Sequence, residues 1–277
     1  MDRRSEKTMN NIFMADSPMA EHIIASPNYN ERRMQNKPDM VLLHYTGMDD
    51  AEEAVRRLCD PQAEVSAHYF IFEDGRIWQL VAEKYRAWHA GAGNWQGITD
   101  INSCSIGIEL DNRGHNYPER DRVIPDFPDR QITSLIALIR DIVHRCQISP
   151  LRILAHSDIA PERKADPGEK FPWNKLAESG FGLTGETVLT QSTEGDDRIL
   201  KPGDSGITVG ILQQRLQEIG YGINVTNCYD DRTYHVVQAF QRHFHQKRID
   251  GFADAATLAS LEKVYAGYVG GNDQNTD

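Results

Sequence analysis

Residues 153–168 have the sequence ILAHSDIAPERKADPG, and the organisation of the chain can be worked out from this stretch. Its first four residues, 153–156, form a short apolar run that ends in His156 and is typical of a buried strand. The loop that follows is interrupted by proline and glycine and carries Asp166, ten residues after His156. Because binding sites in α/β sheets lie at strand ends, we expect this strand and loop to form part of a site.

Similar apolar runs precede this stretch, and helical patterns separate them. An Asp74-Gly75 pair between two β-prone runs predicts a hairpin. Apolar side chains at helical spacing over 129–146 predict a long amphipathic helix. Strands interleaved with helices predict an α/β fold with a mixed central β-sheet flanked by helices. The predicted strands are 40–45, 67–72, 77–81, 105–110 and 153–156, and further helices are predicted around Ala54, Val55 and Leu58 and over 173–179.

The character of the sequence changes after residue 180. Residues 181–197 are rich in Gly, Thr, Ser and acidic residues, which predicts a linker that follows a first domain over 21–180. Residues 198–265 carry three helical stripes of apolar side chains and predict a small all-α three-helix domain. Its expected N-caps are Asp204 or Ser205, Asp230 or Asp231, and Asp254. The remaining residues, 1–20 and 266–277, are expected to form a mobile leader and a frayed tail.

Composition excludes several classes of protein. The 277 residues include 30 basic and 41 acidic side chains, and a net charge of −11 makes nucleic acid an unfavourable partner. No apolar run approaches the roughly 18 residues that a membrane span needs. The start of the chain is basic but lacks the apolar run of a secretory signal, which predicts a cytoplasmic protein, with a periplasmic or wall-associated location as the alternative. Four scattered cysteines without a CxxC pair are typical of free thiols in a reducing compartment.

Two histidines at strand ends are candidates for metal binding. His44 lies near the end of the predicted strand 40–45, and His156 ends another predicted strand. Together with Asp166 they form the two-histidine, one-carboxylate set of many catalytic zinc sites, in which the fourth position is left for water. The same donor set also suits Fe(II) in non-haem oxygenases. A single histidine at a strand end, by contrast, is more often structural.

Glu109 is the unusual residue of the predicted strand 105–110. A carboxylate between Ile108 and Leu110 is costly to bury unless it is paired. Alternation along the strand places Glu109 on the same face as Ser105 and Gly107. This pattern is compatible with a solvent-facing or ion-paired side chain, and also with a general base of raised pKa beside a metal-bound water.

The other histidines give weaker signals for chemistry. His243 and His245 lie two residues apart on a predicted helix, so they point to different faces and are expected to be half-exposed. His68 lies within a predicted strand and is expected to pack in the core. A solvated or structural position is the simplest interpretation for three further histidines, His22, His115 and His144.

These segments resemble the zinc-dependent N-acetylmuramoyl-L-alanine amidases, the family that shares its fold with peptidoglycan-recognition proteins and phage T7 lysozyme. The resemblance covers about residues 38–176 and is most specific at AHSDIAPERKADPGEKFPW (155–173). Within the family, the chain resembles the AmpD/AmiD type of bacterial enzyme. The C-terminal segment resembles a small helical peptidoglycan-binding domain. Other matching stretches are LLHYTG (42–47), SAHYFIFEDGRIWQLV (66–81), AWHAG (87–91) and SIGIELDNRG (105–114), followed by LKPGDSG (200–206), VGILQQRL (209–216), VVQAFQRHF (236–244) and IDGFADAATLASL (249–261).

The resemblance implies that residues 21–180 form a catalytic domain and residues 198–265 a domain that binds peptidoglycan. It implies hydrolysis of the amide between N-acetylmuramic or anhydro-muramic acid and L-Ala of the stem peptide, with peptidoglycan or muropeptides as partners. Glu109 would be the catalytic carboxylate, and Lys164 would lie near the reacting carbonyl, although a lysine in this loop could equally be solvated. The implied Zn²⁺ ligands are His44, His156 and Asp166, and the implied pocket residues are Tyr45 and His89. A recognition protein without catalysis is the alternative, which the presence of Asp166 and Glu109 disfavours.

Overall fold

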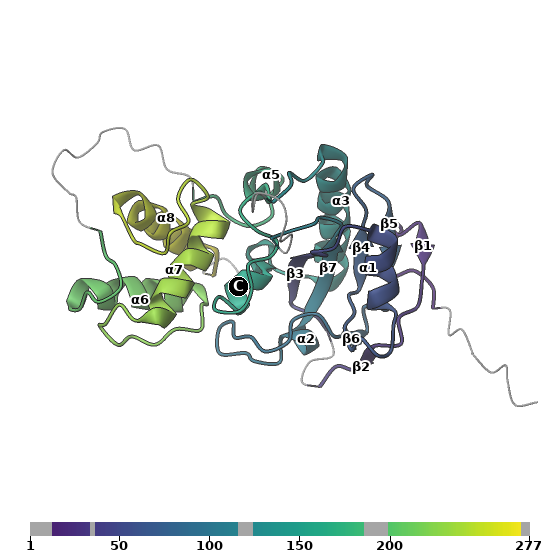
Figure 1. The fold of residues 1–277 in the computed structure, drawn as a ribbon, viewed down its shortest axis with the longest axis horizontal. Coiled ribbons are helices and arrows are strands. Elements are labelled where there is room, and N and C mark those ends of the chain that lie inside the picture. The colour runs from purple at the N-terminus through teal and green to yellow at the C-terminus, as the bar shows by residue number, and fades with distance from the viewer. Residues whose placement is uncertain (1–12, 34–36, 116–123, 186–198, 273–277) are drawn as a thin grey trace, which may run out of the picture.

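The computed structural model describes residues 13–33, 37–115, 124–185 and 199–272 of the chain. A mixed β-sheet with helices on both faces forms the larger part of the molecule, and helices α6, α7 and α8 pack together beside it (Figure 1). The predicted α/β fold with a small helical C-terminal part is therefore confirmed. Among the helices that the structure describes, none is long and apolar enough to cross a membrane.

The central sheet has six strands in the order β1-β5-β4-β7-β3-β8. Strand β3 pairs in parallel with both β7 and β8, so the carboxyl ends of these three strands meet at one edge of the sheet. Strands β4 and β5 form the predicted hairpin across Asp74-Gly75 and pair antiparallel. The sheet consists of β1 (His22–Ile23), β5 (Ile77–Gln79), β4 (Tyr69–Ile71), β7 (Ser105–Leu110), β3 (Met40–Tyr45) and β8 (Ile153–Ala155), and a separate ribbon consists of β2 (Tyr29–Glu31) and β6 (Tyr85–Ala87).

Alternate side chains of the buried strands enter different cores. Val41 and Leu43 of β3 pack with Ile106 and Ile108 of β7 beneath α3 and α5. On the opposite face, α1 covers Phe70 and its neighbours. Helix α3 spans 129–146, as predicted, because apolar side chains at helical spacing continue over its 18 residues. The helices of this part are α1 (Ala51–Leu58), α2 (Ile101–Cys104), α3 (Asp129–Cys146), the short 3-10 helix η1 (Pro150–Arg152), α4 (His156–Ile159) and α5 (Trp173–Glu178).

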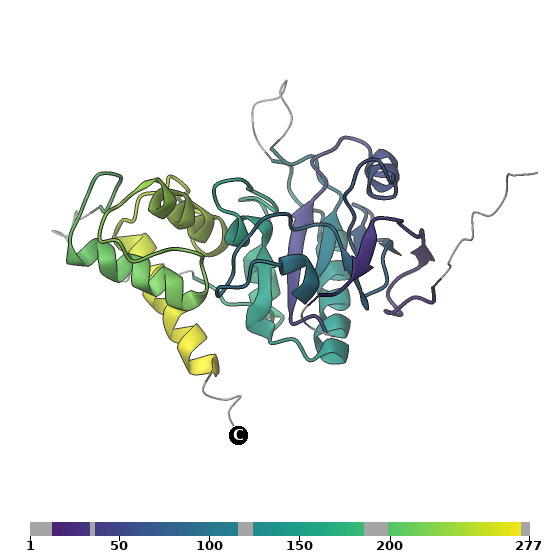
Figure 2. The same cartoon turned by 90° about the horizontal axis from the view of Figure 1, so that it is seen from below.

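The three C-terminal helices share a core with the sheet. A single apolar cluster joins Met40 and Leu42 of β3, through Trp95 and Tyr221, to the buried side chains of the C-terminal helices. Figure 2 shows the three helices from below, with α8 running towards the C-terminus. The small unit is thus docked on the larger one through a continuous hydrophobic contact. These helices are α6 (Ile207–Ile219), α7 (Asp231–Phe244) and α8 (Ala255–Asn272).

The N-caps of the C-terminal helices are partly as predicted. The Asp230 carboxylate accepts a hydrogen bond from the Thr233 amide, and Asp254 accepts one from Thr257. Helix α6 differs, because Gly206 precedes it and provides no side-chain cap. Asp204, which was expected to cap α6, instead accepts a hydrogen bond from the Lys201 amide in the preceding turn.

Three predicted boundaries need correction where the structure describes them. The leader prediction of 1–20 is wrong for its last residues, because Ser17 is fully buried and Asp16 exchanges hydrogen bonds with Gln79. The linker prediction of 181–197 is wrong at its start, because Phe181 is buried in the core beneath α3. The tail prediction of 266–277 is wrong through Asn272, because α8 continues to that residue. Residues 1–12, 186–198 and 273–277 lie outside the described residues.

Candidate metal centre and active site

The predicted metal ligands converge at the carboxyl edge of the parallel strands. His44 lies in β3 opposite Glu109 of β7, and His156 follows β8 as the first residue of α4. The loop after α4 brings Asp166 back to the same edge, where its backbone carbonyl accepts the Ser157 amide. His44, His156 and Asp166 are all buried, and each offers one donor atom within 4.8 Å of the others. These three residues form a group that could hold a metal ion.

A chain of hydrogen bonds determines the tautomer of His44. The Ser105 hydroxyl donates to the Ile101 carbonyl at 2.7 Å and therefore accepts from His89 Nε2 at 3.2 Å. His89 Nδ1 then carries a lone pair and accepts from His44 Nε2 at 3.0 Å. Consequently the neutral His44 ring directs the lone pair of Nδ1 towards the other donor atoms. Burial lowers the pKa of His44 to about 4, which keeps the ring neutral near pH 7.

His156 is oriented in the same way by a backbone group. Its Nε2 donates to the Ala90 carbonyl at 2.9 Å, which leaves a lone pair on Nδ1 of the neutral ring. This Nδ1 lies 2.9 Å from His44 Nδ1 and 2.9 Å from Asp166 Oδ2, and His44 Nδ1 lies 3.0 Å from the same oxygen. Burial opposes ionisation of Asp166, and positive charge at or between the two imidazoles is what holds its pKa below the usual range.

The donor set fits a divalent cation. Two nitrogen lone pairs and a carboxylate oxygen that meet within about 3 Å repel one another unless a cation lies between them. Both ring orientations are set by partners on the far side of each imidazole, which is the usual arrangement around metal-binding histidines. The geometry therefore supports His44, His156 and Asp166 as ligands of one ion.

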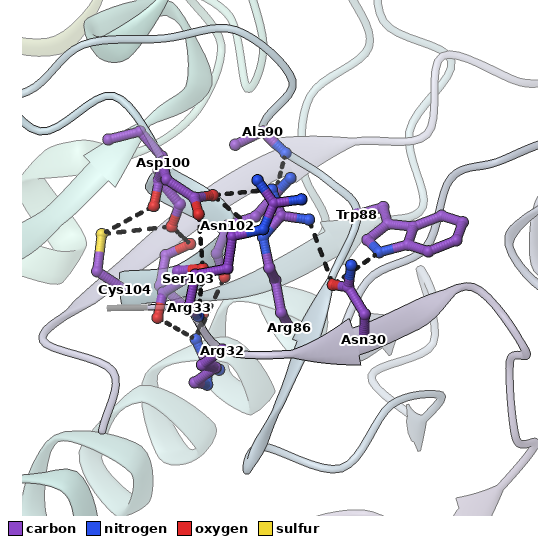
Figure 3. Close-up of polar contacts among 12 residues, drawn as sticks. Asn30, Arg32, Arg33, Arg86, Trp88, Ala90, Asp100, Asn102, Ser103 and Cys104 are labelled. Carbon is purple, nitrogen blue, oxygen red and sulfur yellow. Dashed lines mark hydrogen bonds and ion pairs between the residues drawn. The ribbon is translucent and has the colours of Figure 1, made fainter. Parts of the chain in front are cut away.

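Asn102 of α2 holds the backbone that supplies both of these outer partners. Its side-chain oxygen accepts the amide of His89 at 3.0 Å and the amide of Ala90 at 2.8 Å (Figure 3). His89 bonds to His44, and the Ala90 carbonyl bonds to His156, so one amide side chain supports both histidine ligands. The His89 ring can lie across β7 only because residue 107 is glycine, since a Cβ there would overlap the ring. Sequence reasoning did not single out Asn102, because nothing in its local pattern indicates that role.

Glu109 faces the same cavity as the three candidate ligands. One carboxylate oxygen, Oε2, is buried and has no hydrogen-bond partner among the described residues. Burial raises the pKa of Glu109 well above its usual range, the nearby Asp166 carboxylate raises it further, and Lys164 opposes the shift. A carboxyl group with a raised pKa and a free oxygen directed into a cavity has the properties of a general acid or base.

The cavity has a volume of about 630 Å³, within the usual range for ligand sites. Lys164, Tyr45 and His89 all line it, so the structure brings every predicted site residue to one place. His89 differs from the others, because both of its ring nitrogens contact protein groups, His44 and Ser105. Its position is therefore beside a candidate ligand, where it orients that ligand.

His115 also lines the cavity, although sequence reasoning placed it in a polar loop without a function. The Tyr45 hydroxyl lies 2.9 Å from His115 Nδ1, and His115 Nε2 lies 2.9 Å from the Glu169 carboxylate. Burial raises the pKa of Tyr45 to about 12, and the Asp166 charge acts in the same direction, so the phenol stays protonated and donates to His115. No short-range pattern links these three residues, which come from separate loops and strands.

The remaining histidine predictions have mixed outcomes. His68 is fully buried as expected, with Nε2 near the Tyr85 carbonyl and Nδ1 accepting the Gly107 amide. The prediction for His243 is wrong, because only 4% of this residue is exposed. It lies at the contact between the two parts of the molecule, and Nδ1 is 2.7 Å from Asp158 Oδ2. The helical pattern could not reveal a partner 85 positions away in the sequence.

A mixed α/β sheet thus brings to one cavity a buried His-His-Asp donor set that could hold a metal ion and a carboxylate oxygen without a hydrogen-bond partner among the described residues. The family model for N-acetylmuramoyl-L-alanine amidase matches residues 34–169, and the model for a peptidoglycan binding domain matches residues 205–261. The chain is 37% identical over 237 residues to N-acetylmuramoyl-L-alanine amidase AmiD of Escherichia coli, and the match covers 83% of each protein. The chain belongs to the N-acetylmuramoyl-L-alanine amidase family.

Other relatives and solved structures agree with this assignment. The 1,6-anhydro-N-acetylmuramyl-L-alanine amidase AmpD of Haemophilus influenzae is 32% identical over 174 residues, which are 56% of this chain and 90% of the relative. The structure of E. coli AmiD with anhydro-N-acetylmuramic acid-L-Ala-D-gamma-Glu-L-Lys superposes with a TM-score of 0.70, at 34% identity, over 87% of this chain and 98% of AmiD. AmpDH3 of Pseudomonas aeruginosa with anhydromuramic pentapeptide has a TM-score of 0.70 at 33% identity and covers 88% of this chain and 98% of AmpDH3.

Proposed function

We propose that this chain is a zinc amidase that hydrolyses the bond between N-acetylmuramic or anhydro-muramic acid and L-Ala of the peptidoglycan stem peptide. The observation that carries the proposal is the convergence of His44 Nδ1, His156 Nδ1 and Asp166 Oδ2 in the cavity that also holds the free oxygen of Glu109. Zinc bound by these ligands would polarise a substrate carbonyl and make a water molecule more acidic.

The chain's own residues supply the proton transfers and charge stabilisation. Glu109 Oε2 takes a proton from the attacking water and later delivers a proton to the leaving amide nitrogen. The C–O bond forms first and the C–N bond breaks once the nitrogen has received its proton, so the products are a carboxylate on the sugar and a free amino group on L-Ala. Lys164, which lines the same cavity, stabilises the oxyanion that develops on the carbonyl oxygen. His89 and the Ala90 carbonyl keep both histidine ligands oriented.

Two observations support a muropeptide as the substrate. The AmiD and AmpDH3 structures that this chain superposes on contain an anhydro-muramyl tripeptide and an anhydromuramic pentapeptide, respectively. The cavity of about 630 Å³ can hold a sugar with its first peptide residues. Tyr45, held by His115, forms part of the wall that such a ligand would contact.

Digestion of purified muropeptides, followed by mass spectrometry, tests the proposal. We expect release of intact stem peptide, loss of release after treatment with a chelator, and recovery when zinc is added. Binding to insoluble peptidoglycan without any cleavage would replace the proposal with the recognition-protein alternative. Oxygen consumption that depends on iron would replace it with the Fe(II) oxygenase alternative.

The preferred form of the substrate can be tested in the same assay. Soluble anhydro-muropeptides and intact peptidoglycan are compared at equal concentration of the scissile bond. The cytoplasmic location stays a prediction from the sequence, and fractionation of the source cells tests it. Recovery of the protein with the wall fraction would favour intact peptidoglycan as the substrate in the cell.

A further inference from the structure

Asp158 is a fully buried carboxylate on α4, two residues after the candidate ligand His156. It lies outside the cavity of the active site and has no part in the proposed reaction. One oxygen, Oδ1, accepts the Tyr221 hydroxyl at 2.8 Å. The other, Oδ2, accepts His243 Nδ1 at 2.7 Å and the backbone amide of Ala155 at 2.8 Å. Both oxygens are therefore satisfied, and two of the three donors come from the C-terminal helical unit.

Aromatic rings of both units hold the two donor side chains in place. The His243 ring stacks on Trp173 at 3.6 Å and on Phe244 at 3.8 Å between centroids. The Tyr221 ring meets Trp95 edge-on at 5.1 Å. A buried carboxylate is costly unless such donors compensate it, so these contacts restrict where Asp158 can lie.

Helix α4 depends on this carboxylate for its position. The helix spans four residues, His156–Ile159, and a single turn has little stability of its own. The bond from the Ala155 amide to Asp158 closes this turn immediately before His156. A displacement of Asp158 therefore moves the backbone that carries His156 relative to the Ala90 carbonyl, to which His156 Nε2 donates.

We infer that Tyr221 and His243 of the C-terminal unit position the metal ligand His156 by anchoring Asp158. The C-terminal unit therefore supports the metal centre, in addition to any role in binding peptidoglycan. Tyr221, His243 and Asp158 are positioning residues, since none of them lines the active-site cavity. The inference rests on the proposed metal site but not on the identity of the reaction.

The test compares two tyrosines that donate across the same contact between the units. In the full-length protein, Tyr221→Phe removes the hydroxyl that bonds to Asp158. The matched control, Tyr268→Phe, removes a buried hydroxyl that donates to the Leu151 carbonyl at 2.9 Å, while both oxygens of Asp158 keep their hydrogen bonds. Each variant is loaded with zinc in competition with a chromophoric chelator, and its Co²⁺ form is examined by visible absorption.

We expect Tyr221→Phe to weaken zinc binding about 10-fold or more, as losses of outer partners of metal ligands commonly do, and to change the Co²⁺ spectrum. Turnover of a soluble muropeptide should fall through kcat, with KM nearly unchanged, because the substrate wall is intact. Tyr268→Phe should leave zinc affinity, the Co²⁺ spectrum and kcat as they are. Equal zinc affinity and identical Co²⁺ spectra in both variants would overturn the inference.

Variants at His243 provide a second, independent measurement. His243→Ala should weaken zinc binding, and His243→Asn should restore much of it, because an asparagine amide can donate from a place near that of Nδ1. If His243→Asn behaves like His243→Ala while both remain folded, the hydrogen bond is not what positions α4. Failure of the proposed function is distinguishable, since the wild-type protein would then bind zinc but release no stem peptide.

Discussion

Two buried aspartates, Asp158 and Asp166, lie eight residues apart and have opposite kinds of surroundings. Every contact of Asp158 is a donor: a phenol, a ring N–H and a backbone amide. Asp166 has two contacts to one oxygen, and both come from ring nitrogens that carry lone pairs. The first carboxylate is satisfied by the protein alone, whereas the second requires a cation.

A structural carboxylate and a metal-binding carboxylate differ in the kind of group that contacts them. Burial does not separate them, since Asp158 is 0% and Asp166 is 6% exposed. The hydrogen-bond partners do separate them. Donors surround Asp158, whereas the ring nitrogens beside Asp166 carry lone pairs, because each histidine donates from its other nitrogen.

Asp166→Ala should have the largest effect. We expect zinc binding to be lost, and activity to fall at least as far as the roughly 10²–10⁴-fold that a single catalytic group contributes. The folded state should survive, because a repulsive cluster of lone pairs is removed together with the carboxylate. Zinc content by atomic absorption and the thermal midpoint of the metal-free protein provide the measurements. A variant that still binds one zinc tightly would contradict the ligand assignment.

Glu109→Gln should nearly abolish turnover while zinc stays bound. The amide has the shape of the carboxylate but cannot accept a proton from water, so we expect kcat to fall about 10²–10⁴-fold. Single-turnover kinetics and zinc content are measured on the same preparation. Near-normal activity with full zinc occupancy would rule out Glu109 as the base.

His68 is a buried histidine whose two ring nitrogens both have hydrogen-bond partners within the protein. Burial lowers its pKa from 6.5 to about 3, with the Arg32 charge acting in the same direction. Because the folded pKa lies below the unfolded one, its stabilising contribution is complete above pH 6.5 and is lost as the pH falls towards 3. Removing this dependence in His68→Gln should flatten the pH profile of the free energy of unfolding by up to about 5 kcal/mol. Denaturant titrations of the metal-free protein measure the effect, and the same profile in His68→Gln and wild type would refute it.

His144→Gln is the control for that measurement, since His144 is exposed on α3. It should keep the wild-type profile, because the substitution lies on the exposed surface of α3 and leaves the buried His68 in place.

Asn102→Ala should weaken zinc binding by about 10–100-fold, since it releases the backbone that supplies an outer partner to both histidine ligands. Asn102→Asp retains an oxygen acceptor for the His89 and Ala90 amides and should recover most of the affinity. Competition with a chelator measures both. Equal affinity in Asn102→Ala and wild type would show that His89 and Ala90 hold their places without Asn102.

Tyr268→Phe should have the smallest effect. Loss of its hydrogen bond to Leu151 should reduce the free energy of unfolding by about 1 kcal/mol. Chemical denaturation measures this, and zinc titration of the same sample should match the wild type. A larger loss of zinc affinity would mean that the whole contact between the units, and not Asp158 alone, supports the metal centre.

Several elements could be predicted from the sequence because their signals are local. Strands β3 and β7 and helix α3 have their predicted limits, since a continuous apolar run or a long apolar stripe specifies them. His44 and His156 could be predicted to share a site because both lie at strand ends, and the parallel pairing of β3 with β7 and β8 places Glu109 at the same edge. The roles of these residues in catalysis stay predictions.

Contacts between distant segments could not be predicted in the same way. Asp16 belongs to a segment whose polar sequence predicts mobility, yet it packs because Gln79 and Glu83 offer matching groups. His243 has a partner 85 positions away, and a helical period contains no information about it.

The sequence by itself determined the strand and helix pattern, the negative charge, and the presence of two strand-end histidines with a carboxylate ten residues later. These depend on periodicity and composition, which act along the chain. Only the tertiary structure decided which of two neighbouring aspartates faces lone pairs and which faces donors. That distinction depends on the directions of side chains from β3, α4, α7 and the loop after Ile219, and such directions are set when the cores of the two units pack together.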